Sequence, residues 1–211
     1  MDNITLRSIS QNDLDSIVEI HLNAFSDRAL AGLGREAVRR YYEWQLQGPH
    51  EAIALGIYQD EKLAGFCFGG VFHGSLSGYL QRNKWFLTWR VLTHPWLITA
   101  PFFRERISLA WNVLTHHSNS AISQRVIPKK SFGILAIAID SQIQGAGLGK
   151  RLMAETEKIA IGRDFSHMHL TVDINNIQAI TFYQNLKWQK LPASDGMWHG
   201  AMAKHLERFY E

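Results

Sequence analysis

The residues best suited to chemistry are the glycines between Gln144 and Lys150, which follow an apolar run and open an amphipathic one. Glycine lets the backbone approach a ligand closely, and it lets successive N–H groups turn toward one point. The first N–H groups of a helix have no partner inside it and lie at the positive end of its dipole. Lys150 and Arg151 add positive charge. The sequence therefore predicts a phosphate or pyrophosphate site here.

Two common phosphate-binding loops do not fit the spacing. A P-loop has four residues between its first glycine and a Gly-Lys-Ser/Thr run. Here three residues separate Gly145 from Gly149, and Arg151 follows the lysine. A dinucleotide-binding fingerprint begins directly after its strand, whereas Ser141 to Gln144 intervene here and the third glycine comes one residue early. Only 62 residues (211 − 149) follow the loop, too few for the rest of such a domain.

A third pattern does fit. Gln144-x-x-Gly147-x-Gly149 after a strand resembles the coenzyme A loop of the GNAT superfamily of acetyl-CoA-dependent N-acetyltransferases. The segment 176–183, Asn-Ile-Gln-Ala-Ile-Thr-Phe-Tyr, resembles the helix that follows the next strand in that family. The resemblance covers most of residues 3–72 and 132–203, and the two motifs at the expected separation make it specific.

The resemblance implies acetyl-CoA as co-substrate and no metal. The loop-bearing strand would separate from its neighbour, so that the backbone around Ile137, Ala138 and Ile139 pairs with the pantetheine arm. Asn176 would orient the coenzyme, and Tyr183 would lie near its sulfur. The pyrophosphate would be held by the loop itself, which comprises Gln144, Gly145, Ala146, Gly147, Leu148, Gly149 and Lys150.

The implied reaction is direct attack of a neutral amine on the thioester. An alkylammonium group titrates near 10, so binding must favour loss of its proton. Tyr183 is the predicted general acid, because a tyrosine hydroxyl can protonate the departing thiolate. Three alternatives remain for the base: His73 at the expected end of the third strand, Asp140 after the loop-bearing strand, and a water relay.

Several of these residues also have an interpretation without catalysis. Tyr183 would pack in the core at the same helical spacing, and Asn176 would serve as the N-cap of its helix. Cys67 lies in an apolar strand pattern and is predicted to be a core residue. His167 and His169 alternate with apolar residues, and no His or Cys spacing predicts a metal site.

The elements that position these residues follow from the period of the apolar positions. A polar tetrad at 59–62 predicts a hairpin, and Ser10 with Asp13 forms a predicted helix-capping pair. Strands are expected at 4–6, 52–58, 63–71, 132–140, 167–172 and 197–203, and helices at 14–24, 35–46, 147–161 and 177–186. The expected α/β (α+β) fold is one domain, 1–211, with a twisted, mostly antiparallel sheet, helices on both faces and a parallel pair at the coenzyme cleft.

One position departs from the family. Where its members usually have Gly-Phe after the tyrosine helix, this chain has Lys187-Trp188. Trp188 can fill the same apolar slot. Lys187 must either adopt a left-handed conformation, which costs about 1 kcal/mol, or the helix must end differently.

The segment from His73 to Ser131 is predicted to be a helical insertion between the third and fourth strands. It carries eight Lys or Arg and one acid (8 − 1 = +7), whereas the whole chain carries +3. Short helices broken near Pro95 and Pro101 are expected. Four of the seven tryptophans lie in it: Trp85, Trp89, Trp96 and Trp111.

This insertion has several interpretations. It would cover the core, form the interface of a homodimer, or close over the substrate. A basic, aromatic lid would suit an anionic acceptor such as a nucleotide-linked amino sugar or an amino acid, with Arg104 and Arg106 contributing charge. Two rival interpretations are a basic amphipathic face that binds membrane surfaces and an acyltransferase that houses a longer acyl chain.

Composition sets the remaining bounds. Hydrophobic residues make up 46% and charged residues 19%, which excludes a disordered chain. The only cysteine is Cys67, so no intramolecular disulfide forms. The start of the chain has no signal-peptide pattern, and the apolar stretch 86–103 is interrupted by charge and proline. A cytoplasmic protein without a transmembrane segment is expected, and no pattern of nucleic-acid binding is present.

Overall fold

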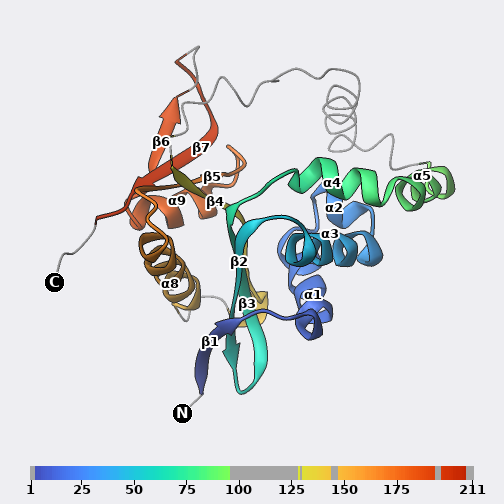
Figure 1. Cartoon of the computed structure of the whole chain (residues 1–211), viewed down its shortest axis with the longest axis horizontal. Coiled ribbons are helices and arrows are strands. Elements are labelled where there is room, and N and C mark those ends of the chain that lie inside the picture. The colour runs from blue at the N-terminus through green and yellow to red at the C-terminus, as the bar shows by residue number, and fades with distance from the viewer. Residues whose placement is uncertain (1–2, 96–127, 129, 144–146, 193–195, 208–211) are drawn as a thin grey trace.

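The computed structural model describes residues 3–95, 128, 130–143, 147–192 and 196–207. Seven strands form one open sheet in the order β1-β2-β3-β4-β5-β7-β6 (Figure 1). The strands are β1 (Ile4–Ser8), β2 (Glu51–Gln59), β3 (Lys62–Val71), β4 (Ser131–Ile139), β5 (His167–Thr171), β6 (Gln189–Pro192) and β7 (Trp198–His205). The helices are η1 (Gln11–Asp13), α1 (Leu14–Ala24), α2 (Ala29–Gly32), α3 (Arg35–Gln47), α4 (Ser75–Arg82), α5 (Lys84–Thr93), η3 (Ser141–Ile143), α8 (Leu148–Gly162) and α9 (Ile177–Asn185).

The sheet is antiparallel between all neighbours except β4 and β5, which run parallel. The predicted hairpin joins β2 to β3, and its turn residues Asp60 and Glu61 both have positive φ, as a tight two-residue hairpin turn requires. The predicted capping pair also forms, because the Ser10 N–H donates to the Asp13 carboxylate over 2.8 Å. These features confirm the expected mixed fold.

The sheet separates two apolar cores, one on each face. Figure 1 shows α8 and α9 on one side of the sheet and α1 to α3 on the other. Beneath α8 and α9 lies a cluster that includes Cys67, Phe132, Leu152, Met153 and Trp188. Beneath α1 and α3 lies a second cluster that includes Ile17, Tyr42, Phe66, Phe68 and Ala138. Both faces of β3 and β4 are therefore covered, which explains why these strands are almost wholly apolar.

A β-bulge interrupts β4. Phe68 pairs with Ala136 but Gly69 pairs with Ile134, so Leu135 is an extra residue on β4. Before the bulge Phe132 and Ile134 face the α8 side, and after it Ile137 and Ile139 do. Leu135, Ala136 and Ala138 contact the other core. The bulge thus reverses the alternation of side chains and bends the strand that leads to the glycine loop.

The described part of the segment predicted to be an insertion, which includes α4 and α5, packs on α3 and the residues just before it. The Tyr79 hydroxyl donates to the Ala37 carbonyl oxygen over 3.2 Å, and the Arg40 guanidinium lies 4.4 Å from the centre of the Phe86 ring. The Arg90 Nε donates to the Leu33 carbonyl oxygen over 2.9 Å. Helix α5 ends at Thr93, two residues before Pro95, as predicted. The predicted break at Pro101 and the residues Trp96, Arg104, Arg106 and Trp111 lie outside the described residues.

Apart from the two short 3-10 helices η1 and η3, two described elements were not predicted. The short helix α2 carries no clear period, and β6 contains Lys190 and Pro192, which argue against a strand. Pairing with β7 on the sheet edge is what makes β6 a strand. Within the part of the chain that the structure describes, no helix combines the length and the apolar character needed to cross a bilayer.

Candidate functional site

The site begins where β4 and β5 part. Their parallel ladder runs from Ser131 opposite His167 to Ile134 opposite Leu170. Strand β5 ends one residue later, whereas β4 continues along β3 to Ile139. Beyond Ile134, no described strand pairs with the β5 side of β4. This opening, bounded by residues 135–139 of β4 and the end of β5, is called the β4/β5 wedge below. The predicted pantetheine contacts Ile137, Ala138 and Ile139 all lie along it.

Helix α8 follows β4 in the chain and begins at the end of the wedge that is nearest to Ile139. Its N-cap, Gly147, has φ +75°, a left-handed conformation that favours glycine. The N–H groups of Leu148, Gly149 and Lys150 are the first three of the helix and have no acceptor within it. Leu148 is buried and anchors this end, whereas Lys150 is exposed. The predicted residues Gln144, Gly145 and Ala146 lie outside the described residues.

The protein itself does not require a glycine at position 149. A Cβ built there would lie 3.6 Å from Ile139 Cγ1 and from the Phe182 ring, which is ordinary contact. An alanine would therefore fit the folded chain. The glycine instead keeps the first turn of α8 open toward Ile139, where a ligand can approach the backbone.

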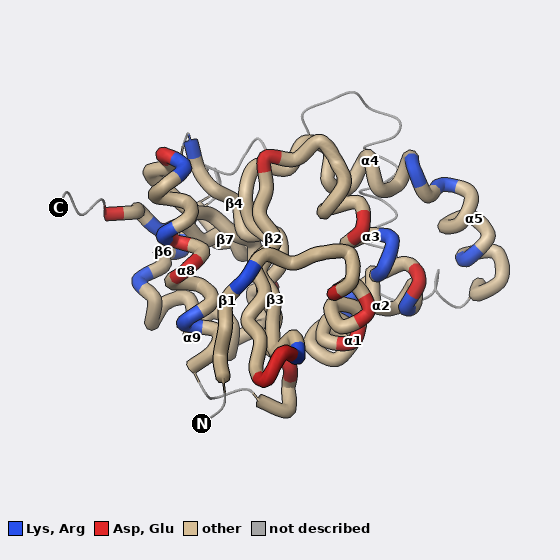
Figure 2. The backbone as a smooth tube through the Cα atoms, turned by 60° about the horizontal axis from the view of Figure 1, so that its bottom comes forward, with Lys and Arg blue, Asp and Glu red and all other residues tan. Residues whose placement is uncertain are grey.

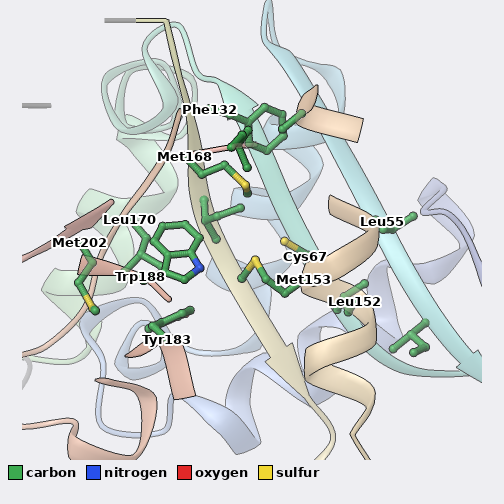
Figure 3. Close-up of a cluster of buried hydrophobic side chains, with 14 of the residues drawn as sticks. Leu55, Cys67, Phe132, Leu152, Met153, Met168, Leu170, Tyr183, Trp188 and Met202 are labelled. Atoms are coloured by element: carbon green, nitrogen blue, oxygen red, sulfur yellow. The ribbon is translucent and has the colours of Figure 1, made fainter. Parts of the chain in front are cut away.

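Tyr183 projects from α9 toward the middle of β4. Its side chain is 8% exposed and joins the cluster that contains Cys67 (Figure 3). Cys67 pairs with Ile137 across β3 and β4, so the tyrosine lies beside the wedge. Burial, with a smaller effect of nearby Cys67, raises the pKa of Tyr183 well above its ordinary value. Burial also raises the pKa of the Cys67 thiol to about 12, so Cys67 is a neutral core residue.

Both ends of α9 are fixed by specific bonds. At the start, the Asn176 side-chain oxygen accepts a hydrogen bond from the Ala179 N–H over 3.0 Å, so Asn176 is the N-cap. At the end, the Lys187 N–H donates to the Gln184 carbonyl and the Trp188 N–H to the Tyr183 carbonyl. This is a Schellman motif, with Lys187 at φ +66° in the position usually held by glycine. The left-handed alternative predicted for Lys187 is confirmed.

An ion pair closes one side of the site. Arg28, in the loop after α1, bonds to Asp173, in the loop between β5 and α9, over 2.8 Å. Arg28 and Asp173 are 145 residues apart in the chain, and this bond joins the two loops. Asp173 also accepts a hydrogen bond from the Asn175 N–H, and this bond and Arg28 lower its pKa. The loop that carries Asn176 is therefore held against the α1 side of the molecule.

The two base candidates lie at opposite ends of β4. His73 follows the end of β3 that pairs with Gly133, near the start of β4, and its Nε2 lies 3.5 Å from a Glu51 carboxylate oxygen. Asp140 follows the other end of β4. Its carboxylate accepts a hydrogen bond from the Gln142 N–H over 3.0 Å and so shapes the turn that leads into the glycine loop. The structure does not bring these two side chains together.

Two buried polar groups were missed as functional candidates. The indole nitrogen of Trp188 and the Nε2 of His21 have no hydrogen-bond partner among the described residues. The other ring nitrogen of His21 lies 2.9 Å from the Tyr42 hydroxyl, and burial lowers the pKa of His21 to about 4. In the sequence, His21 is a histidine on an apolar helix face and Trp188 is an aromatic residue in an apolar slot. Neither pattern predicts that a buried nitrogen lacks a hydrogen-bond partner.

The parting of β4 from its parallel neighbour, followed by a helix that begins after Gly147, is the arrangement that the resemblance to the GNAT superfamily implies for a coenzyme A site. The chain belongs to the acetyltransferase (GNAT) family, whose sequence model matches residues 14–188. It is thus an N-acetyltransferase. No curated protein matches the chain in sequence.

Solved structures of the same fold extend over nearly the whole chain. The ribosomal-protein-S18-alanine N-acetyltransferase of Escherichia coli is 16% identical, with a TM-score of 0.57, and the match covers 99% of this chain and 97% of that one. The PaiA N-acetyltransferase of Thermoplasma acidophilum, solved with coenzyme A, is 14% identical, with a TM-score of 0.57 and coverage of 96% and 99%. An acetyltransferase of Thermus thermophilus is 14% identical, with a TM-score of 0.56 and coverage of 97% of each chain. At such identities the likeness shows the fold alone.

Proposed function

We propose that this protein transfers the acetyl group of acetyl-CoA to the primary amine of a small molecule, by direct attack and without a metal. The observation that carries the proposal is the alignment of three features along β4. These are the start of α8 for the pyrophosphate, the β4/β5 wedge for the pantetheine arm, and Tyr183 for the sulfur. Such a path leads from a phosphate site to a buried hydroxyl, which is the order of groups in the coenzyme.

The chemistry follows from this placement. The amine nitrogen attacks the thioester carbon, and the carbon–sulfur bond breaks as the carbonyl re-forms. The Tyr183 hydroxyl donates to the departing sulfur and delivers its proton there. The nitrogen becomes positively charged as it bonds to the carbon, and the proton it then loses returns through water to the Tyr183 oxygen and restores the hydroxyl. Because burial raises the pKa of Tyr183, the hydroxyl stays protonated at neutral pH. A thiolate released in the same buried wedge is destabilised too, so the proton is drawn to the sulfur.

The acceptor amine binds as an ammonium ion, and its extra proton must leave before the attack by a route that does not involve Tyr183. Asp140 is bonded within its turn, and His73 lies near Glu51 at the far end of β4. Both geometries favour the water relay, through which the ammonium proton passes to solvent before attack. The pantetheine contacts at Ile137 to Ile139 and the pyrophosphate contacts from Gln144 to Lys150 are part of this proposal, as is a role for the Asn176 amide at the coenzyme.

The acceptor class follows from charge. Figure 2 shows Lys and Arg but no Asp or Glu along α4 and α5, where Arg82, Lys84 and Arg90 lie. We infer an anionic amine, such as an amino sugar or amino acid. We also infer a cytoplasmic location, because the sequence holds a single cysteine, Cys67, and so forms no intramolecular disulfide of the kind common in oxidising compartments.

The test is release of free thiol from acetyl-CoA in the presence of pooled amines. The pools are amino acids, amino sugars, polyamines and peptides with a free amino terminus; the last is included because the Escherichia coli relative is titled for a ribosomal-protein alanine. The proposal expects amine-dependent thiol release with at least one pool, and none with Gly147→Glu. Thiol release from longer acyl-CoA donors is measured in the same assay. Faster release from a longer donor than from acetyl-CoA would show that the protein transfers a longer acyl group.

One observation favours a second candidate function. Trp85 and Trp89 on α5 are 78% and 68% exposed, beside Lys84. Exposed aromatic residues next to cations are typical of surfaces that bind membranes or partner proteins, including a second copy of the chain. Flotation with anionic vesicles distinguishes the two functions, since vesicle binding without affinity for coenzyme A would favour this second function.

A further inference from the structure

The indole N–H of Trp188 is a buried donor without an acceptor. The side chain is 3% exposed and lies in the core beneath α8 and α9, and its Nε1 has no hydrogen-bond partner among the described residues. Buried polar groups are almost always hydrogen-bonded in native proteins. An unpaired buried donor therefore needs an explanation, such as a hydrogen bond to a ligand that is absent from the structure.

The donor faces β4, the strand that borders the β4/β5 wedge. Figure 3 shows the indole nitrogen on the edge of the ring that is turned toward β4, and away from Leu170 and Met202. The Trp188 ring lies 5.7 Å from the Tyr183 ring, centre to centre. The Trp188 indole and the Tyr183 ring therefore lie together at the end of α9, on its β4 side.

Packing does not require this N–H. The Schellman bond from the Trp188 backbone to the Tyr183 carbonyl oxygen sets the position of the residue whatever its side chain. A phenylalanine would fill the apolar slot without burying an unpaired donor. Compared with a phenylalanine, the indole of Trp188 therefore adds a hydrogen-bond donor that is directed at β4, the strand that borders the wedge.

We propose that Trp188 Nε1–H donates a hydrogen bond to a carbonyl oxygen at the acyl-pantetheine end of the bound coenzyme. This inference rests on the proposed function, because the coenzyme supplies the acceptor. The arm carries two kinds of carbonyl, the pantetheine amides and the thioester, and either would satisfy the orphaned donor. With the coenzyme bound, Trp188 and Tyr183 hold it from one side of the wedge.

The test is calorimetric titration of Trp188→Phe with coenzyme A and with acetyl-CoA. The expected dissociation constant rises about tenfold, equivalent to about 1.4 kcal/mol. An equal loss for both ligands assigns the bond to a pantetheine amide, and a loss confined to acetyl-CoA assigns it to the thioester. Unchanged affinity for both ligands overturns the proposal.

A matched control is available in the same chain. Trp44 on α3 also has a buried indole N–H without a partner among the described residues, in the other half of the molecule. Trp44→Phe therefore removes the same group and is expected to leave both dissociation constants unchanged. If Trp44→Phe weakened binding as much as Trp188→Phe, the effect would be general and the proposal would fail.

A second measurement does not depend on the folding of the variant. In wild-type protein labelled with ¹⁵N, the indole resonance of Trp188 is expected to move downfield on saturation with acetyl-CoA, while that of Trp44 stays in place. A Trp188 resonance that does not move on a saturated protein overturns the proposal. Failure of the proposed function gives a different result, because the wild type then shows no saturation at all.

Discussion

Tyr183 and Trp188 are joined through both backbone and rings. The Trp188 N–H donates to the Tyr183 carbonyl oxygen over 3.0 Å, and their rings lie 5.7 Å apart at the end of α9. The turn between them places the proposed general acid and the orphaned indole donor next to each other at the end of α9. The end of a single short helix thus organises one whole side of the site.

Removal of the Tyr183 hydroxyl is expected to slow the chemical step. Tyr183→Phe keeps the packed ring but loses the proton donor, so kcat falls by about 10²-fold while the affinity for acetyl-CoA changes little. Tyr79→Phe removes a hydroxyl that bonds to Ala37 in the insertion and leaves kcat unchanged. Steady-state assays of thiol release measure both, and an unchanged kcat in Tyr183→Phe would show that Tyr183 only packs.

The pH profile gives a related test. Because burial raises the pKa of Tyr183 above its ordinary value of 10.0, the hydroxyl does not ionise at pH 9. The rate is expected to rise with pH as the acceptor amine loses its proton, and to show no alkaline decline up to pH 9. A fall below pH 9 that is absent in Tyr183→Phe would contradict the raised pKa.

Gly149 separates coenzyme binding from folding. Gly149→Ala places a methyl group at ordinary contact distance from Ile139 and Phe182, and alanine favours a helix by up to about 1 kcal/mol. Thermal stability is therefore expected to stay equal or rise, while the affinity for coenzyme A falls at least tenfold. Gly162→Ala, at the other end of α8, changes neither coenzyme affinity nor the fold. Unchanged affinity in Gly149→Ala would mean that the ligand does not approach the first turn of α8.

Lys187 carries backbone strain that glycine would relieve. At φ +66° a lysine is disfavoured, so Lys187→Gly is expected to stabilise the fold by about 0.5–1 kcal/mol and raise the Tm by about 2 °C. The same substitution in the interior of α8, Lys158→Gly, is expected to destabilise by a similar amount. Calorimetric melting distinguishes them, and a lower Tm in Lys187→Gly would contradict the left-handed conformation.

His21 makes stability depend on pH. Its pKa is about 4 in the folded protein and 6.5 in an exposed histidine, so folding favours the neutral ring. The stabilisation is complete above pH 6.5 and is lost as the pH falls toward 4, by at most about 3 kcal/mol.

His21→Leu tests this dependence. At pH 7 the variant is less stable, because the Tyr42 hydroxyl loses its partner at a cost of about 1–3 kcal/mol. The difference from the wild type is expected to shrink as the pH falls, since the leucine has no proton to bind. His50 and His169, whose pKa values burial also lowers, add the same slope to both proteins. Parallel pH curves in urea denaturation would contradict a lowered pKa for His21.

Much of this architecture could be predicted from the sequence. The hairpin around Asp60, the strand that ends at Ile139 and the helix that begins after Gly147 all have strong local signals, namely an apolar period, a polar turn or glycine. The two motifs fix the order of the coenzyme site along the chain. Local signals of this kind need no knowledge of distant partners.

The remainder depends on tertiary context. The bulge at Leu135 lies within an unbroken apolar run, so no change of period marks it. Strand β6 exists because β7 pairs with it, despite Lys190 and a proline. The separation of His73 from Asp140 follows from the antiparallel pairing of β3 with β4. The residue types that made both of them base candidates carry no information about this pairing.

The central claim is that the start of α8 and the β4/β5 wedge hold the coenzyme. Isothermal titration of the folded protein with acetyl-CoA tests it most directly, with Gly147→Glu as control, because a carboxylate at the helix start repels the pyrophosphate. The account predicts saturable, one-to-one binding by the wild type in the micromolar range and none by the variant. No saturable binding by well-folded wild type at millimolar acetyl-CoA, or equal binding by both proteins, would contradict it.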